Sequence, residues 1–352
     1  MRAVWWAWSV PFLTACNLGY LTENAGRTDA GEHGDGAQPA PDAGSDADAG
    51  TMDSGSMDSG ATDTGAVDVV DAGWSSWTDG SSSFADLAAV WGSSSGDVWA
   101  VGFNTILHWD GTAWSVSPAS VGPLNAVWGS SRTDVWAVGE DGAILHYDGT
   151  LWSPTDAGAA AMEHGTTWNG VWGSASNDVW VVGEADGGGP IAHWDGTGWS
   201  LSTTLDAGLQ SVWGASSSAI WTVGTSNTIA TYAGGSWQRQ PDQVSVPDDF
   251  TSVWGSSAQS VWAVSQDGPI VLFDGTSSAW GPATMTGGFN GVWGSGAADV
   301  WAVGYGGAVI HYDGSSWSQP VSVTTNGLNG VWGTGPDDVW AVGNGGTILH
   351  HP

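Results

Sequence analysis

Seven copies of one short pattern run through most of the chain. The letters VWG recur with their tryptophan at positions 91, 128, 172, 213, 254, 293 and 332, so the mean spacing is about 40 residues. A second tryptophan follows eight residues after each of these, in DVWAVG or a close variant of it. A repeat of this length accommodates four short strands with their turns, which is one blade of a propeller.

The copy at residues 124–154 shows how one repeat divides. LNAVWG and DVWAVG read as two apolar strands, AILHY as a third and TLWSP as a fourth, and the DG before the last one favours a hairpin. No stretch repeats apolar residues at helical spacing. The middle strands carry unbroken apolar runs, as expected for sheets buried on both faces. We therefore predict an all-β fold, a single seven-bladed β-propeller of four-stranded blades over residues 74–352, with most tryptophans in its core.

The two ends of the repeat array complement each other. The last copy stops after three strands, at AVGNGGTILHHP, whereas a spare DAGWSSW precedes the first copy. Trp77 lies 14 residues before the first VWG tryptophan, and the same interval separates Trp114 from Trp128. We therefore expect the strand at 74–77 to pair with the strand at 347–351. The N-terminal strand would complete the seventh blade and remove the free edges of an open array.

The first 15 residues have the pattern of a signal peptide, with Arg2 before a short apolar stretch. That stretch ends in LTAC, which resembles the lipobox of bacterial lipoproteins. The resemblance implies that Cys16, the sole cysteine, is acylated and anchors the chain. Asn17 is not the Asp that retains such proteins at the inner membrane, so the resemblance implies an outer-membrane lipoprotein, periplasmic or surface-exposed. The alternative is an ordinary secretory signal with an unrelated cysteine.

Residues 16–73 have a different composition, with a long stretch of Asp, Gly, Ala, Ser and Thr. Mutually repelling acids and few apolar side chains predict a disordered linker. Its DADAG spacing is similar to a calcium loop, but the closing Glu of that motif is missing, so we interpret it as a spacer. The whole chain has a formal charge of −32 with four Arg and no Lys, which argues against nucleic acid as a partner.

The repeats also resemble a known group of proteins. With their DG…W hairpins, residues 74–352 are similar to bacterial β-propellers of the Asp-box (BNR) and photosystem-II-assembly-factor-like group. Asp148, Gly149 and Trp152 are spaced one residue more tightly than an Asp-box, so the resemblance lies in the fold more than in the motif. A lipobox, an Asp-rich linker and these repeats together are similar to surface lipoproteins of myxobacteria.

Loop length varies mainly on one face of the predicted ring, since the other face has a single longer hairpin, at Asp274–Trp280. The connections from VWG to DVW are constant, whereas the blade-to-blade connections and one turn between second and third strands vary. Variable loops on a rigid scaffold commonly bind partners, although neutral insertions remain the alternative. The longest are at 153–167, 184–190 and 239–249. The candidate binding residues in them are Asp156, Glu163, His164, Glu184, Asp186, Arg239, Asp242, Asp248 and Asp249.

The number of histidines suggests a metal site, but their equivalent positions in different repeats argue against one. Five of them occupy the third strand of different blades, and equivalent positions of different blades cannot converge on one ion. These are His108, His146, His193, His311 and His350. A weak site at His164 and Glu163 is the remaining alternative. We predict no metal and no cofactor.

The function predicted is a non-catalytic, cell-surface recognition module that binds a protein or a glycan and is monomeric. Propeller sialidases use three arginines and kelch-type oxidases a Cys–Tyr pair, whereas residues 74–352 hold two arginines and no cysteine. One alternative is an assembly or adhesion scaffold, like photosystem assembly factors or type IV pilus tip proteins. The other is a glycoside hydrolase that uses Glu184 with Asp186, or Asp248 with Asp249.

Overall fold

The structure is a computed structural model. It describes residues 68–69, 73–77, 85–118, 122–155, 165–240, 249–267, 269–274, 281–286 and 288–352. The predicted signal peptide, the lipidation at Cys16 and nearly all of the linker lie outside these residues. In the part of the chain that is described, no helix is long and apolar enough to cross a membrane.

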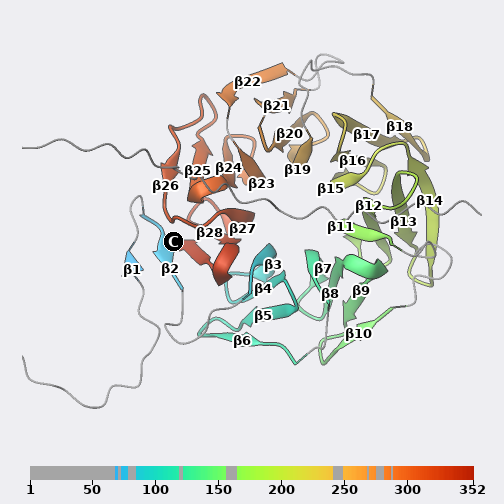
Figure 1. Cartoon of the computed structure of the whole chain (residues 1–352), viewed down its shortest axis with the longest axis horizontal. Helices are drawn as coiled ribbons and strands as arrows, with labels where there is room; N and C mark the ends of the chain where they lie inside the picture. Colours follow the sequence, from blue (N-terminus) through green and yellow to red (C-terminus); the bar gives the residue numbers. More distant parts are fainter. Residues whose placement is uncertain are drawn as a thin grey trace, which may run out of the picture. The chain divides into compact units, whose positions relative to one another are not determined.

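Seven antiparallel sheets follow one another around a ring (Figure 1), and the prediction of an all-β, seven-bladed propeller is confirmed. Each blade begins with an inner strand that contacts the inner strands of both neighbouring blades, and β27 contacts β3 to close the circle. The inner strands of blades 1 to 7 are β3 (Leu87–Ser94), β7 (Leu124–Ser131), β11 (Thr167–Ala175), β15 (Leu209–Ser216), β19 (Phe250–Ser257), β23 (Phe289–Gly296) and β27 (Leu328–Gly335).

The other strands follow outward in chain order. The second strands are β4 (Asp97–Gly102), β8 (Asp134–Gly139), β12 (Asp178–Glu184), β16 (Ala219–Gly224), β20 (Ser260–Ser265), β24 (Asp299–Gly304) and β28 (Asp338–Gly343). The third strands are β5 (Thr105–Trp109), β9 (Ile144–Tyr147), β13 (Gly189–Trp194), β17 (Thr228–Ala233), β21 (Pro269–Phe273), β25 (Ala308–Tyr312) and β29 (Ile348–His351). The outer strands of blades 1 to 6 are β6 (Trp114–Val116), β10 (Trp152–Pro154), β14 (Trp199–Leu205), β18 (Ser236–Arg239), β22 (Gly281–Thr286) and β26 (Val321–Ser322).

The VWG motif is the joint between blades. At Gly129 a Cβ atom would lie 2.5 Å from the ring of Trp91 in the preceding blade, and at Gly214 it would lie equally close to Trp172. The same contact recurs at all seven joints, including the closing one, where the ring of Trp332 lies over Gly92. Each tryptophan therefore needs a glycine in the next blade, which explains why the two residues recur together.

The N-terminal strand completes blade 7, as predicted. β2 (Ser75–Ser76) pairs with β29, with Ser75 opposite His350, and β1 (Asp68–Val69) adds a fifth strand outside it, ahead of the expected boundary at residue 74. The register differs from the prediction based on Trp77. Trp74, only 1% exposed, takes the place of the outer-strand tryptophan and packs edge-on against Trp301. Trp77 instead packs against Trp340, because the loop that follows this strand is three residues longer than the 14-residue interval implied.

A second repeated contact holds the outer part of five blades. In blade 1 the Nε2 of His108 donates to Asp97, Ser93 donates to the other carboxylate oxygen, and the His108 ring stacks on Trp99. The His–Asp distance is 2.6–2.7 Å in all five blades. We call this the Asp–His network; its other pairs are Asp134–His146, Asp178–His193, Asp299–His311 and Asp338–His350.

The network shows what the third-strand histidines do: each binds the aspartate of its own blade. Sequence analysis correctly kept them apart from one another but missed their partners. The signal was present, because blades 4 and 5 lack both members at once: Ala219 and Thr231 replace the pair in blade 4, and Ser260 and Leu272 replace it in blade 5.

Candidate functional site

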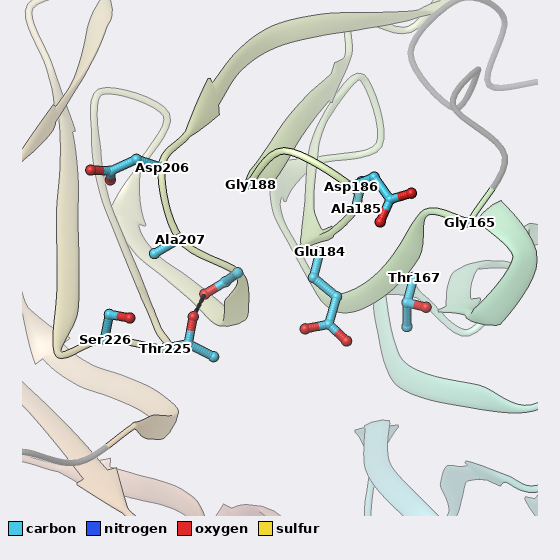
Figure 2. Close-up of a pocket in the computed structure, with 11 residues that line it drawn as sticks. Gly165, Thr167, Glu184, Ala185, Asp186, Gly188, Asp206, Ala207, Thr225 and Ser226 are labelled. Carbon is cyan, nitrogen blue, oxygen red and sulfur yellow. Dashed lines mark hydrogen bonds between the residues drawn. The ribbon is translucent and has the colours of Figure 1, made fainter. Parts of the chain in front are cut away.

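A hollow of about 490 Å³ lies on the variable face where blades 3 and 4 meet (Figure 2). One wall is the turn between β12 and β13, and the other is the connection from blade 3 to blade 4 with the turn between β16 and β17. Its described lining residues are Gly165, Thr167, Glu184, Ala185, Asp186, Gly188, Asp206, Ala207, Gly208, Thr225 and Ser226.

The first wall is the enlarged turn that the sequence singled out. Ala185 and Gly188 exchange backbone hydrogen bonds of 2.9 and 3.1 Å, so the turn is a small closed loop rather than a loose insertion. It exposes the carboxylates of Glu184 and Asp186. Figure 2 shows the Glu184 side chain between Thr225 on one side and Thr167 on the other. A carboxylate therefore lies between the two walls.

The second wall is held by charged side chains. Arg239 binds Asp206 at 2.7 Å and donates to the carbonyl oxygen of Ser226 at 3.2 Å. Asp249 accepts a hydrogen bond of 2.8 Å from the backbone N–H of Ser226. Ser226 and Asn227 both have φ of 55°, a left-handed conformation that costs a non-glycine residue about 1–2 kcal/mol. These contacts fix a strained turn at the edge of the hollow.

The structure brings together four of the nine predicted binding residues. Glu184 and Asp186 line the hollow, and Arg239 and Asp249 hold its second wall. The other five lie outside the described residues: Asp156, Glu163, His164, Asp242 and Asp248. Sequence analysis missed Asp206 and Ser226, because both lie in connections of ordinary length. For Asp206 the only signal was an acidic residue shortly before the next inner strand, and Ser226 had none.

The lining is small and acidic. Small-molecule pockets are mostly lined by apolar and aromatic side chains, whereas no aromatic residue is among the described lining residues here. Among those residues, and across the rest of the described chain, no group of three or more His, Cys, Asp or Glu could hold a metal ion. The arrangement suits contact with a polar or positively charged surface better than catalysis on an enclosed substrate.

A smaller hollow of about 180 Å³ lies at the centre of the ring and is lined by the inner strands. Polar side chains there link most blades to the next. Asn125 donates to the carbonyl of Trp168 at 3.1 Å, and Asn329 donates to that of Leu87 at 2.8 Å across the closing joint. At the joint between blades 1 and 2 the corresponding residue is Ala88, so this joint lacks such a bond. The polar residues around the central hollow therefore mainly serve to join neighbouring blades.

Solved structures share this architecture. The structure described as "YCF48 bound to D1 peptide" aligns with a TM-score of 0.65 and 18% identity, covering 81% of this chain and 99% of that one. YCF48 from Cyanidioschyzon merolae gives 0.62 and 16%, covering 80% and 98%. The WD40 β-propeller domain of Doa1 gives 0.64 and 14%, covering 76% and 93%. No protein-family model and no curated protein sequence matches the chain. At these identities the likeness establishes the β-propeller class.

Proposed function

We propose that the protein is a non-catalytic recognition module, a lipid-anchored propeller of the bacterial outer membrane that binds a partner through its variable face. The observation that carries the proposal is the hollow between blades 3 and 4. It lies on the face where loop lengths vary, its second wall is fixed by an ion pair and hydrogen bonds, and it exposes carboxylates. Variable loops held by a rigid scaffold are commonly the places where proteins bind their partners.

A protein is the preferred partner. YCF48, a propeller of similar fold, has been solved with a D1 peptide, which supports the proposal of a protein partner. A glycan is the second candidate, but the described lining lacks aromatic rings on which a sugar would stack. The same geometry would serve an assembly or adhesion scaffold, which differs in what the partner does rather than in how it binds.

A glycoside hydrolase is the enzymatic alternative. It would use Glu184 and Asp186, which lie two residues apart in one exposed turn. Two catalytic carboxylates must flank the scissile bond from opposite sides. Side chains of a single tight turn are poorly suited to that task, so binding is the better proposal.

The binding proposal is tested by cross-linking in intact cells. A photo-reactive amino acid at position 186 should capture a discrete partner, and the same group at position 337, exposed on the opposite face, should not. Glu184→Gln should reduce the adduct at position 186. Equal adducts at both positions, or none at either, would contradict the proposal.

The anchor is tested separately. Cys16→Ser should move the protein from the membrane fraction to the soluble fraction if the cysteine carries the lipid. Mass spectrometry of the N-terminal peptide would show the acyl groups directly. Identical fractionation of the two proteins would reject the anchor while leaving the binding proposal intact.

A further inference from the structure

One turn position per blade surrounds the centre of the variable face. It is the residue after the glycine or serine that ends the repeated second-strand motif, and in blade 3 it is the last residue of β12. In five blades its N–H donates to the carbonyl of the residue before the inner strand, at 2.9–3.1 Å. From blade 1 to blade 7 the residues are Phe103, Glu140, Glu184, Thr225, Gln266, Tyr305 and Asn344.

This ring of positions, the turn ring, differs in character from the strands that support it. The preceding strand reads DVWAVG in four blades, but the turn residue is aromatic, acidic or polar in different blades. The chain therefore keeps its scaffold constant and changes the side chain shown to solvent. On a repeat scaffold, such positions are where a partner is recognised.

The two aromatic members are on the blades that flank blade 7. Phe103 is 59% exposed and Tyr305 is 52% exposed. The Tyr305 ring is seated on the backbone of Gly288, where a Cβ atom would lie 2.3 Å from its Cδ2. A lone exposed apolar residue needs no explanation. Aromatic side chains are enriched in binding interfaces, so two exposed rings at equivalent turn positions make this part of the ring a candidate recognition surface.

The acidic members are on blades 2 and 3, next to Phe103 in ring order. Glu140 and Glu184 are both exposed, and Asp186 continues the acidic side into the hollow. Residues 74–352 contain 24 Asp and Glu against two Arg. The surface thus combines excess negative charge with exposed aromatic faces, and the chain itself supplies almost no cations to cover it.

A guanidinium group can bind both the acidic and the aromatic members of the turn ring. A guanidinium forms paired hydrogen bonds with carboxylates and also stacks on aromatic rings, whereas an ammonium makes no planar stacking contact. We propose that the partner docks an arginine-bearing protein segment across the turn ring, with guanidinium groups on Phe103 and Tyr305 and others on Glu140 and Glu184. This rests on the proposed binding function and adds the partner's chemistry.

The test measures binding of the full chain, in detergent, to a fluorescent arginine-rich peptide and to a lysine peptide of equal charge and length. We expect at least fivefold tighter binding of the arginine peptide. Phe103→Ala and Tyr305→Ala should remove that preference, and Glu140→Gln should weaken both peptides. The matched controls are Leu151→Ala, an exposed apolar residue away from the turn ring, and Asp337→Asn on the opposite face; neither should change binding.

Each other result overturns the inference. Equal binding of both peptides, unaffected by the aromatic substitutions, would reduce the interaction to net charge. Glycan-array binding that is lost in Phe103→Ala and Tyr305→Ala would assign the aromatic residues to a sugar instead. If position 186 still cross-links a partner in cells while the peptides fail to discriminate, the proposed function stands and the arginine chemistry falls.

Discussion

Blades 3 and 4 stand side by side and are built differently. Blade 3 has the Asp–His network through Asp178 and His193, whereas blade 4 has Ala219 and Thr231 in those places. Both keep the contact of a tryptophan on the next glycine, and the tryptophans at 180 and 237 still pack edge-on across their joint. In blade 4 Trp221 contacts Trp213 of its own blade instead of a histidine.

The comparison of blades 3 and 4 distinguishes a contact that every joint of the ring has from a contact that a single blade can lack. The tryptophan–glycine contact occurs at every joint, including the one that closes the ring. The Asp–His network acts inside one blade, so losing it weakens that blade alone. Aspartate and histidine disappear together in blades 4 and 5 because a carboxylate buried without its partner costs more free energy than no carboxylate at all.

The largest effect is expected in blade 7, which has the Asp–His network but takes its outer strand from the N-terminal end of the propeller. A protein starting at residue 85 lacks β1, β2 and Trp74, and it should melt far below one starting at residue 61 or aggregate. Loss of one buried tryptophan side chain alone costs about 3–5 kcal/mol, a large share of the roughly 5–15 kcal/mol that stabilises a domain. Calorimetry of both proteins is the measurement. Equal melting temperatures would show that this strand does not close the ring.

A second prediction compares single positions in blades with and without the network. Asp97→Ala removes the acceptor of His108 and Ser93 and should lower the free energy of unfolding by about 1.5–3 kcal/mol. The equivalent change in blade 5, Ser260→Ala, should stay within about 0.5 kcal/mol. Urea titration measures both. A comparable loss in the two variants would mean that the network contributes nothing specific.

A third prediction concerns the transfer of the aspartate–histidine pair into a blade that lacks it. Ala219→Asp together with Thr231→His should install the aspartate–histidine pair in blade 4, where Trp221 already stands in the required place and Ala215 takes the position of the serine. We expect a favourable coupling of about 1 kcal/mol in a double-mutant cycle, with Ala219→Asp alone destabilising. Strictly additive effects would reject the aspartate and histidine as a coupled pair.

The smallest expected effect is on pH dependence. The hydroxyl of Thr150 and backbone N–H groups hydrogen-bond Asp148 and lower its pKa to about 2, from an ordinary 3.8; the hairpins at Asp110 and Asp313 do the same. In the network, burial of Asp134 opposes ionisation, but hydrogen bonds from His146 and Ser130 outweigh it and lower its pKa.

Because these folded-state pKa values are depressed, their stabilisation is present above pH 4 and is lost as pH falls towards 2. Thermal melting between pH 6 and 2.5 should show this loss. Asp148→Asn keeps an acceptor oxygen for the turn and should flatten the curve slightly, whereas Ser260→Ala should leave its slope unchanged. A slope that does not respond to Asp148→Asn would remove this hairpin from the explanation.

The sequence predicted the blades, their number and the closing strand because each depends on local apolar runs or on repeat spacing. It misplaced the closing tryptophan by three residues, since loop length does not determine register. It named Glu184 and Asp186, whose turn is visibly enlarged, but not Asp206. The place of Asp206 in the hollow depends on Arg239, 33 residues away, and such a contact has no periodic signature.

The closing strand also has a consequence for biosynthesis. Residues 75 and 76 leave the ribosome early, yet their partners at 349 and 350 are made some 270 residues later. Until then Trp74 lacks the strand against which its side chain packs, and the six earlier blades do not yet form a closed ring. Ring closure is therefore a late event that joins the first-made part of the propeller to the last. Until the last blade is made, the early segment must be kept from pairing with the wrong strand edge.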